Sequence, residues 1–138
     1  MKANRVTLIT LGVADMDRAR AYYEALGWVP ESAEGPVAFY DLGGQKLGLY
    51  ERAKLAEDLG RAPGELGTGA MTLAQNFASE AEVDAAYEVA LAAGATPCKR
   101  PEKVFWGGYS GTLADPDGHV WEYAMNPFWP LDDEGRLA

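Results

Sequence analysis

The apolar residues of the chain follow two periods, and each period predicts a different kind of element. In two segments they recur every three or four positions, which predicts amphipathic helices. One helix is expected to begin after the capping residue Asp15 and to end at Gly27. The other is expected to begin after Ser79 and to end at Gly94. Alternating or β-branched apolar runs predict strands at 6–13, 28–33, 37–42, 46–51, 70–77, 96–100 and twice within 106–127.

The segment 106–127 predicts a hairpin whose turn is Asp115-Pro116-Asp117-Gly118. Proline presets φ in such a turn, aspartate bonds back to the local backbone, and glycine accepts a positive φ. Alternation after the turn places Glu122 on the face opposite Trp121 and Tyr123. Glu122 is thus a single carboxylate on a strand of large apolar residues, which makes it the first candidate for chemistry.

The order of strand, helix and three strands occurs twice along the chain. Such a duplication predicts an α+β fold of two tandem βαβββ modules, in which each sheet lies under its own helix and the modules form a cupped mixed sheet. We expect a single domain over 1–138, with a first module at about 4–51, a linker at about 52–69, a second module at about 70–127 and a tail at 128–138.

The composition narrows the class of protein. The chain has 138 residues, of which 48% are hydrophobic, and its formal net charge is -9. This charge argues against nucleic acid or an anionic membrane surface as a partner. The single cysteine, Cys98, excludes an internal disulfide, and no apolar run approaches the roughly 18 residues of a membrane-spanning helix. We therefore expect a globular, cytoplasmic protein.

Three segments carry a family resemblance, namely LGVADMDRARAYYEALGW at 11–28, VDAAYEVALAAGA at 83–95 and LADPDGHVWEYAMNP at 113–127. They resemble the vicinal oxygen chelate superfamily, which includes glyoxalase I, bleomycin-resistance proteins, fosfomycin-modifying enzymes and extradiol dioxygenases. The resemblance implies paired βαβββ modules with a cupped site, and a homodimer that light scattering would detect. It does not name a substrate, because this fold hosts many chemistries.

Metal-dependent members of this superfamily hold their ion with one residue, typically His or Glu, from each of four strands. The resemblance places these four positions on Leu8, near Gly48, on Thr72 and on Glu122. Leucine and glycine offer no donor atom, and a neutral threonine hydroxyl is a weak ligand, whereas divalent ions need about three or more protein donors. We therefore expect no cofactor. A divalent metal is the alternative, if an alignment shifted by one residue brings Gln75 or Asn76 into the site.

Glu122 has two open interpretations. In one, a neighbouring hydroxyl or arginine binds the carboxylate, which is left over from a metal-binding ancestor. In the other, Glu122 faces a ligand as an acid or base, because a carboxylate that loses solvation in an apolar cup suits proton transfer.

Aromatic residues beside glycines predict the rest of the site. Trp106 and Tyr109 flank Gly107 and Gly108, with Gly111 nearby, which suggests an aromatic platform with room for a planar or apolar ligand. Other candidates lie on neighbouring strands or on the cup face. The full set of predicted ligand-binding residues is Trp106, Tyr109, Tyr40, Tyr50, Asn76, Thr72 and Leu8.

These patterns support one main hypothesis about function. The chain is expected to be a metal-free protein similar to glyoxalases and bleomycin-resistance proteins, which binds a small apolar or aromatic molecule between its strands. Glu122 would supply proton chemistry. One alternative is a metal-dependent lyase, transferase or dioxygenase of the same superfamily. A second alternative is a non-catalytic dimeric module whose cup is filled.

Overall fold

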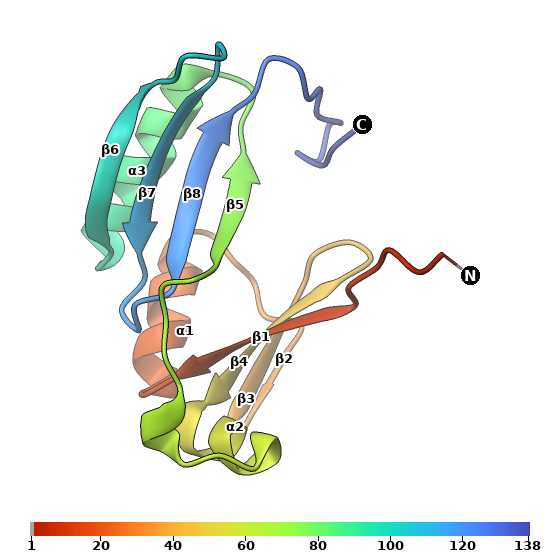
Figure 1. Cartoon of the computed structure of the whole chain (residues 1–138), viewed down its shortest axis with the longest axis vertical. Helices are drawn as coiled ribbons and strands as arrows, with labels where there is room; N and C mark the ends of the chain where they lie inside the picture. Colours follow the sequence, from red (N-terminus) through yellow and green to blue (C-terminus); the bar gives the residue numbers. More distant parts are fainter. Residues whose placement is uncertain (1) are drawn as a thin grey trace. The chain divides into compact units, whose positions relative to one another are not determined.

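The computed structural model describes residues 2–138, and the chain divides into two compact units between Gly67 and Thr68. The first unit contains β1 (Leu8–Val13), α1 (Met16–Ala25), β2 (Ser32–Glu34), β3 (Val37–Asp41), β4 (Lys46–Glu51), α2 (Arg52–Leu59) and a 3-10 turn at Pro63–Glu65. The second unit contains β5 (Thr72–Asn76), α3 (Glu80–Ala93), β6 (Thr96–Lys103), β7 (Tyr109–Ala114) and β8 (Val120–Met125). Each unit therefore has the predicted order of strand, helix and three strands (Figure 1).

Each unit has one four-stranded sheet, and the two sheets share the same topology. The strand order is β1-β4-β3-β2 in the first unit and β5-β8-β7-β6 in the second. In both, the first strand of the unit pairs in parallel with the last, and the other pairs are antiparallel. The structure thus confirms the α+β fold of two βαβββ modules, each with a mixed sheet.

Helix α1 packs on the first sheet because its apolar residues lie on one side. The side chain of Asp15 caps the helix by accepting a hydrogen bond of 3.1 Å from the backbone N–H of Arg18. The helix's own side chains Tyr22 and Tyr23 are buried. The predicted strand at 28–33 begins only at Ser32 as β2, because the ring of Trp28 instead packs on that of Tyr23, with 5.6 Å between centroids.

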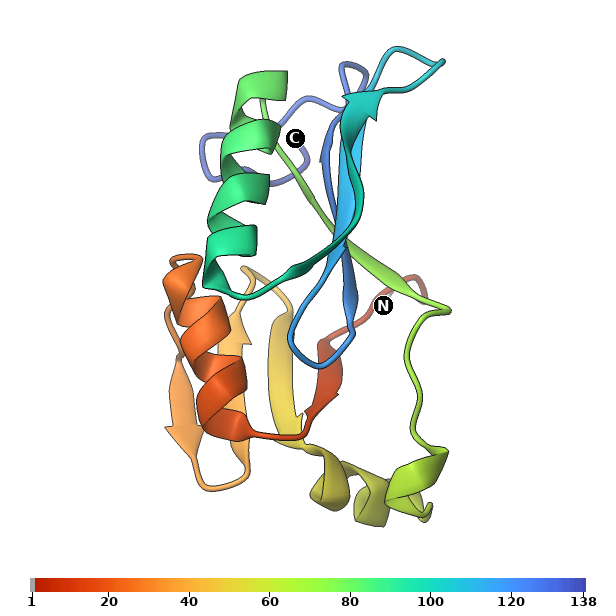
Figure 2. The same ribbon diagram turned by 90° about the vertical axis from the view of Figure 1, so that its left-hand side faces the viewer.

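Helix α3 covers one face of the second sheet, where it packs on β6, β7 and β8 (Figure 2). Ser79 caps it by accepting a hydrogen bond of 3.2 Å from the backbone N–H of Glu82, as the capping box predicts. Buried Tyr87 then donates its hydroxyl hydrogen to the carbonyl oxygen of Thr112, at 2.8 Å. No helix within residues 2–138 has both the length and the apolar character needed to cross a membrane.

Asp115 organises the turn between β7 and β8. Its side chain is buried, and one carboxylate oxygen accepts hydrogen bonds of 2.9 Å from the backbone N–H groups of Asp117 and His119. Gly118 has a φ of 89°, which a side chain would disfavour. The predicted turn is therefore confirmed, and it sets the register that places Glu122 on β8.

Candidate functional site

Glu122 lies on the face of the second sheet opposite α3. Its neighbours on the same face are Thr112 of β7 and Ala74 of β5, which pair with it in the sheet register. Trp121 and Tyr123, on either side of it along β8, are buried on the helix side. Glu122 itself is half-buried, and the orientation predicted from alternation is confirmed.

The same face carries two of the predicted ligand-binding residues. In the register of β5 and β8, Thr72 pairs with Val120 and Asn76 pairs with Ala124, two residues before and after the Ala74–Glu122 pair. We call this surface the open face of the second sheet, and define it by Thr72, Ala74, Asn76, Thr112 and Glu122. The side chains directly beside Glu122 on this face, Ala74 and Thr112, are short.

No side chain satisfies the Glu122 carboxylate within the described part of the chain. Over residues 2–138, it takes part in no hydrogen bond and no ion pair. The hydroxyl or arginine contact that one interpretation of Glu122 requires is therefore not present among these residues. A ligand donor that reaches the open face would compete with no side chain of residues 2–138 for this carboxylate.

The corresponding face of the first sheet carries Leu8 and Tyr50 at opposite ends. Leu8 pairs with Lys46 at the start of β4, and Tyr50 lies near its end. A Cβ atom added to Gly48 between them would lie 3.3 Å from the ring of Phe39 and 3.6 Å from Leu8, so these apolar groups fill the space. The hydroxyl of Tyr50 is hydrogen-bonded to Asp58 on α2, which raises its pKa.

Tyr40 lies on the other face of the first sheet, under α1. It is 1% exposed, and its ring centroid lies 5.6 Å from that of Trp28 and 6.4 Å from that of Tyr23. Burial is the main reason that the pKa of its hydroxyl is raised. A ligand on the face of Leu8 and Tyr50 does not reach this side chain, so the placement does not support Tyr40 as a ligand-binding residue.

Tyr109 and Trp106, the predicted aromatic platform, both make contacts within the second unit. The hydroxyl of Tyr109 donates a hydrogen bond of 2.7 Å to Asp84 of α3, which places Tyr109 on the helix side of the sheet. The ring of Trp106 instead covers Gly108, where an added Cβ would lie only 2.1 Å from a ring carbon. The protein's own side chains therefore fill the space at Gly108, whereas nothing lies within 4 Å of the Cβ position of Gly107.

The residues at the four positions that the family resemblance gives do not fit a divalent metal. At these positions, only Glu122 has a carboxylate, and the space at Gly48 is filled by carbon atoms. Within residues 2–138, no three His, Cys, Asp or Glu side chains gather closely enough to hold an ion. One carboxylate would leave such an ion largely hydrated.

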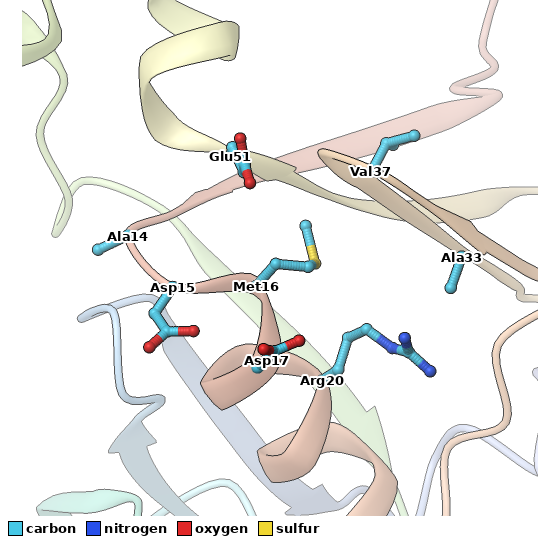
Figure 3. Close-up of a pocket in the computed structure, with 9 residues that line it drawn as sticks. Ala14, Asp15, Met16, Asp17, Arg20, Ala33, Val37 and Glu51 are labelled. Carbon is cyan, nitrogen blue, oxygen red and sulfur yellow. The ribbon is translucent and has the colours of Figure 1, made fainter.

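A cavity of about 510 Å³ in the first unit contains none of the predicted ligand-binding residues. Glu51 of β4 lines it together with Asp15, Asp17 and Arg20 of the α1 segment (Figure 3). Arg20 is already paired with Glu24, 2.9 Å away. The sequence offered no signal for this cavity, because charged residues in the first turn of a helix ordinarily face solvent.

Comparison with known proteins identifies relatives over nearly the whole chain. A family model described as the Glyoxalase/Bleomycin resistance protein/Dioxygenase superfamily matches residues 5–123. The crystal structure of a glyoxalase-related enzyme from Fulvimarina pelagi is 36% identical, with a TM-score of 0.90, and the match covers 98% of this chain and 97% of that one. No curated protein sequence gave a significant match.

Two more distant structures share the fold. An enzyme of the glyoxalase/bleomycin resistance protein/dioxygenase family from Burkholderia phytofirmans PsJN is 24% identical, with a TM-score of 0.76 and coverage of 86% and 96% of the two chains. Lactoylglutathione lyase from Agrobacterium tumefaciens is 22% identical, with a TM-score of 0.70 and coverage of 95% and 100%. At this level of identity the likeness shows the fold alone.

Proposed function

Because the chain belongs to the glyoxalase/bleomycin resistance protein/dioxygenase superfamily, we propose that it binds a small apolar or aromatic molecule on the open face of the second sheet. Glu122 would be the polar contact of that molecule. The observation that supports this most is the half-buried Glu122 carboxylate, which lies between Ala74 and Thr112 with no partner within residues 2–138. A hydrogen bond from a ligand stabilises a half-buried carboxylate more than a fully hydrated one. The reason is that the half-buried group has already lost part of its hydration, so binding removes less.

Glu122 also has the chemistry of an acid or base toward such a ligand. A carboxylate within about 2.6–3.2 Å of a ligand N–H or O–H group can accept its proton and return it to another atom. An apolar ligand body that covers the open face would exclude water and strengthen this interaction. No step is assigned to a metal, because the donor atoms do not fit one.

Replacing Glu122 with glutamine is expected to weaken binding of a neutral aromatic amine about tenfold, because a hydrogen bond to a charged acceptor is worth roughly 1.5–3 kcal/mol. The probe is 1-aminoanthracene, whose amine can donate to Glu122 and whose fluorescence rises in an apolar environment. A fluorescence titration of the wild-type protein and of Glu122→Gln measures the two dissociation constants.

Two variants give this experiment its controls. Glu88→Gln removes the same charge from α3, where Glu88 is exposed and pairs with Arg100, and it is expected to bind like the wild type. Ala74→Trp places a large ring beside Glu122 and is expected to block the probe. Unchanged binding in both Glu122→Gln and Ala74→Trp would exclude the open face as the site.

We also expect the purified protein to contain no stoichiometric divalent metal. Elemental analysis of dialysed protein measures this directly, with fewer than about 0.1 ions per chain expected, because a single carboxylate holds such an ion weakly. One tightly bound ion per chain would contradict the expectation. It would instead favour the alternative of a metal-dependent lyase, transferase or dioxygenase.

An enzymatic role has one further support. The relative that is 36% identical over nearly the whole chain is described as a glyoxalase-related enzyme. Proton chemistry by Glu122 is the enzymatic form of the proposal that these residues permit. If Glu122→Gln changed stability slightly but left ligand binding and turnover intact, the chain would instead act as a non-catalytic module.

A further inference from the structure

The tail of the chain builds a second cavity, at the end of the second sheet. Its volume is about 470 Å³, which lies in the range of small-molecule sites. The ends of β5 and β8, the start of α3 and residues of the tail line it. Figure 1 shows the tail at this end of the sheet, where β5 and β8 end.

Hydrogen bonds give the tail a defined conformation. A carboxylate oxygen of Asp132 accepts bonds of 2.9 Å from the backbone N–H groups of Glu134 and Arg136. Leu131 forms a β-bridge with Leu137, and the backbone N–H of Ala138 donates to the carbonyl oxygen of Pro130 at 2.9 Å. The cavity is therefore part of the fold of the second unit.

Carboxylates are the only charged side chains that line this cavity. They are Glu82, Asp132 and Asp133, and no Lys, Arg or His is among the lining residues. The hydrogen bond from the backbone of Arg136 is the main cause that lowers the pKa of Asp132, so its side chain is ionised at neutral pH. The lining thus favours a cation over an anion.

The start of α3 does not reverse this preference. A helix N-terminus favours anions through its exposed N–H groups and its dipole. Here the helix supplies its own anions, because Glu80 and Glu82 lie in its first turn and Ser79 accepts the hydrogen bond from the N–H of Glu82. The carboxylates from the tail come in addition to these.

The remaining lining combines two amides, Asn76 and Asn126, with apolar and aromatic side chains. Met125, Leu131 and Trp129 are among the latter, and Trp129 is 54% exposed. A tryptophan ring attracts cations through its negative face, and substituted ammonium groups make use of such rings. We propose that this tail cavity binds a small organic cation that carries an apolar body, such as a substituted ammonium ion.

This site goes beyond the function proposed for Glu122. Glu122 does not line the tail cavity, and Asn76 is the one residue that the cavity shares with the open face as defined above. Glu122→Gln is therefore expected to leave cation binding unchanged.

Titration of the full chain with benzyltrimethylammonium, followed by the indole N–H signals in NMR spectra, tests the proposal. We expect a saturable shift of the Trp129 signal, which the loss of one signal in Trp129→Phe assigns. Benzyl alcohol, which has the same ring and no charge, is expected to bind at least about tenfold more weakly, because it lacks the cationic contacts. A Trp129 signal unmoved by the ammonium probe, or equal binding of the two probes, would overturn the proposal.

Two charge variants show which residues carry the effect. Asp133→Asn removes one lining charge and is expected to weaken binding of the ammonium probe roughly fivefold. Glu88→Gln removes a charge that does not line the cavity. It is expected to change the affinity for the ammonium probe less than twofold, because an exposed distant charge is screened. The same result in both variants would mean that overall charge causes the binding, and would also overturn the proposed site.

Trp129→Leu, which keeps an apolar side chain, is expected to lose affinity for the ammonium probe, and unchanged affinity would count against the aromatic contact.

Discussion

Replacing Gly111 with alanine is expected to destabilise the second unit by about 1–3 kcal/mol, the usual cost of forcing extra atoms into a packed region. A Cβ atom at this position of β7 would lie 2.7 Å from the backbone nitrogen of Pro101 and 2.8 Å from two of its ring carbons. Pro101 belongs to β6, so the backbone of a whole edge strand would have to move. Urea unfolding of the wild type and of Gly111→Ala measures the difference.

Gly108→Ala is the matched control for this prediction. Its Cβ would lie even closer to a neighbour, at 2.1 Å, but the neighbour is the ring of Trp106, whose side chain is partly exposed and can rotate away. Both variants lower the conformational entropy of the unfolded chain in the same way. We therefore expect Gly108→Ala to cost less than about 1 kcal/mol. Equal losses in the two variants would show that β6 is not rigid at Pro101.

The order of the elements was predictable because it depends on chemistry close in sequence. Asp15 and Ser79 accept the hydrogen bonds that begin α1 and α3, and Asp115 accepts those that close the turn before β8. The start of β2 depends on a contact between elements, because Trp28 leaves the strand path to pack on Tyr40. Such contacts are not visible in a local pattern.

The site was predictable only in part, for a related reason. Alternation placed Glu122 correctly because Trp121 and Tyr123 on either side identify the buried face of β8. An aromatic residue such as Tyr40 or Tyr109 suits either face of a strand. Its orientation depends on contacts with residues far away in the sequence, and the sequence alone does not show which residues these are.

The glycines of the hairpin illustrate the same limit. A glycine beside aromatic residues leaves a space, but the sequence does not show what fills it. Here the ring of Trp106 lies against Gly108, and Pro101 lies against Gly111. The tail cavity had no signal either, because it depends on hydrogen bonds to Asp132 that are formed only when the tail folds back.

Glu122 depends on its buried neighbours for its position, and Tyr123 allows this dependence to be measured. Tyr123 is 3% exposed, and its ring lies 5.5 Å from that of Phe77. Burial raises the pKa of its hydroxyl to about 12, whereas a tyrosine in the unfolded chain ionises near pH 10. Ionisation of Tyr123 therefore requires either a buried charge or an opening of the second unit beside Glu122.

Stability is expected to fall as the pH rises from about 10 to 12, because the unfolded chain loses the Tyr123 proton first. The stabilisation is complete below pH 10 and is lost as the pH passes through the folded-state pKa. This one group accounts for about 1.4 kcal/mol by pH 11 and at most about 2.7 kcal/mol, at 1.36 kcal/mol per pKa unit. Urea unfolding at pH 8 and pH 11 measures the loss.

Tyr123→Phe removes this titration while it keeps the ring. The variant is expected to lose about 1.4 kcal/mol less than the wild type between pH 8 and pH 11. Burial also raises the pKa values of Tyr40 and Tyr87, but these residues are present in both proteins, so the difference isolates Tyr123. If both proteins lost stability equally, Tyr123 would titrate alike folded and unfolded. Water would then reach the Tyr123 hydroxyl in the folded protein. The packing around Tyr123, which fixes the orientation of Glu122 on β8, would be less tight than the burial of Tyr123 indicates.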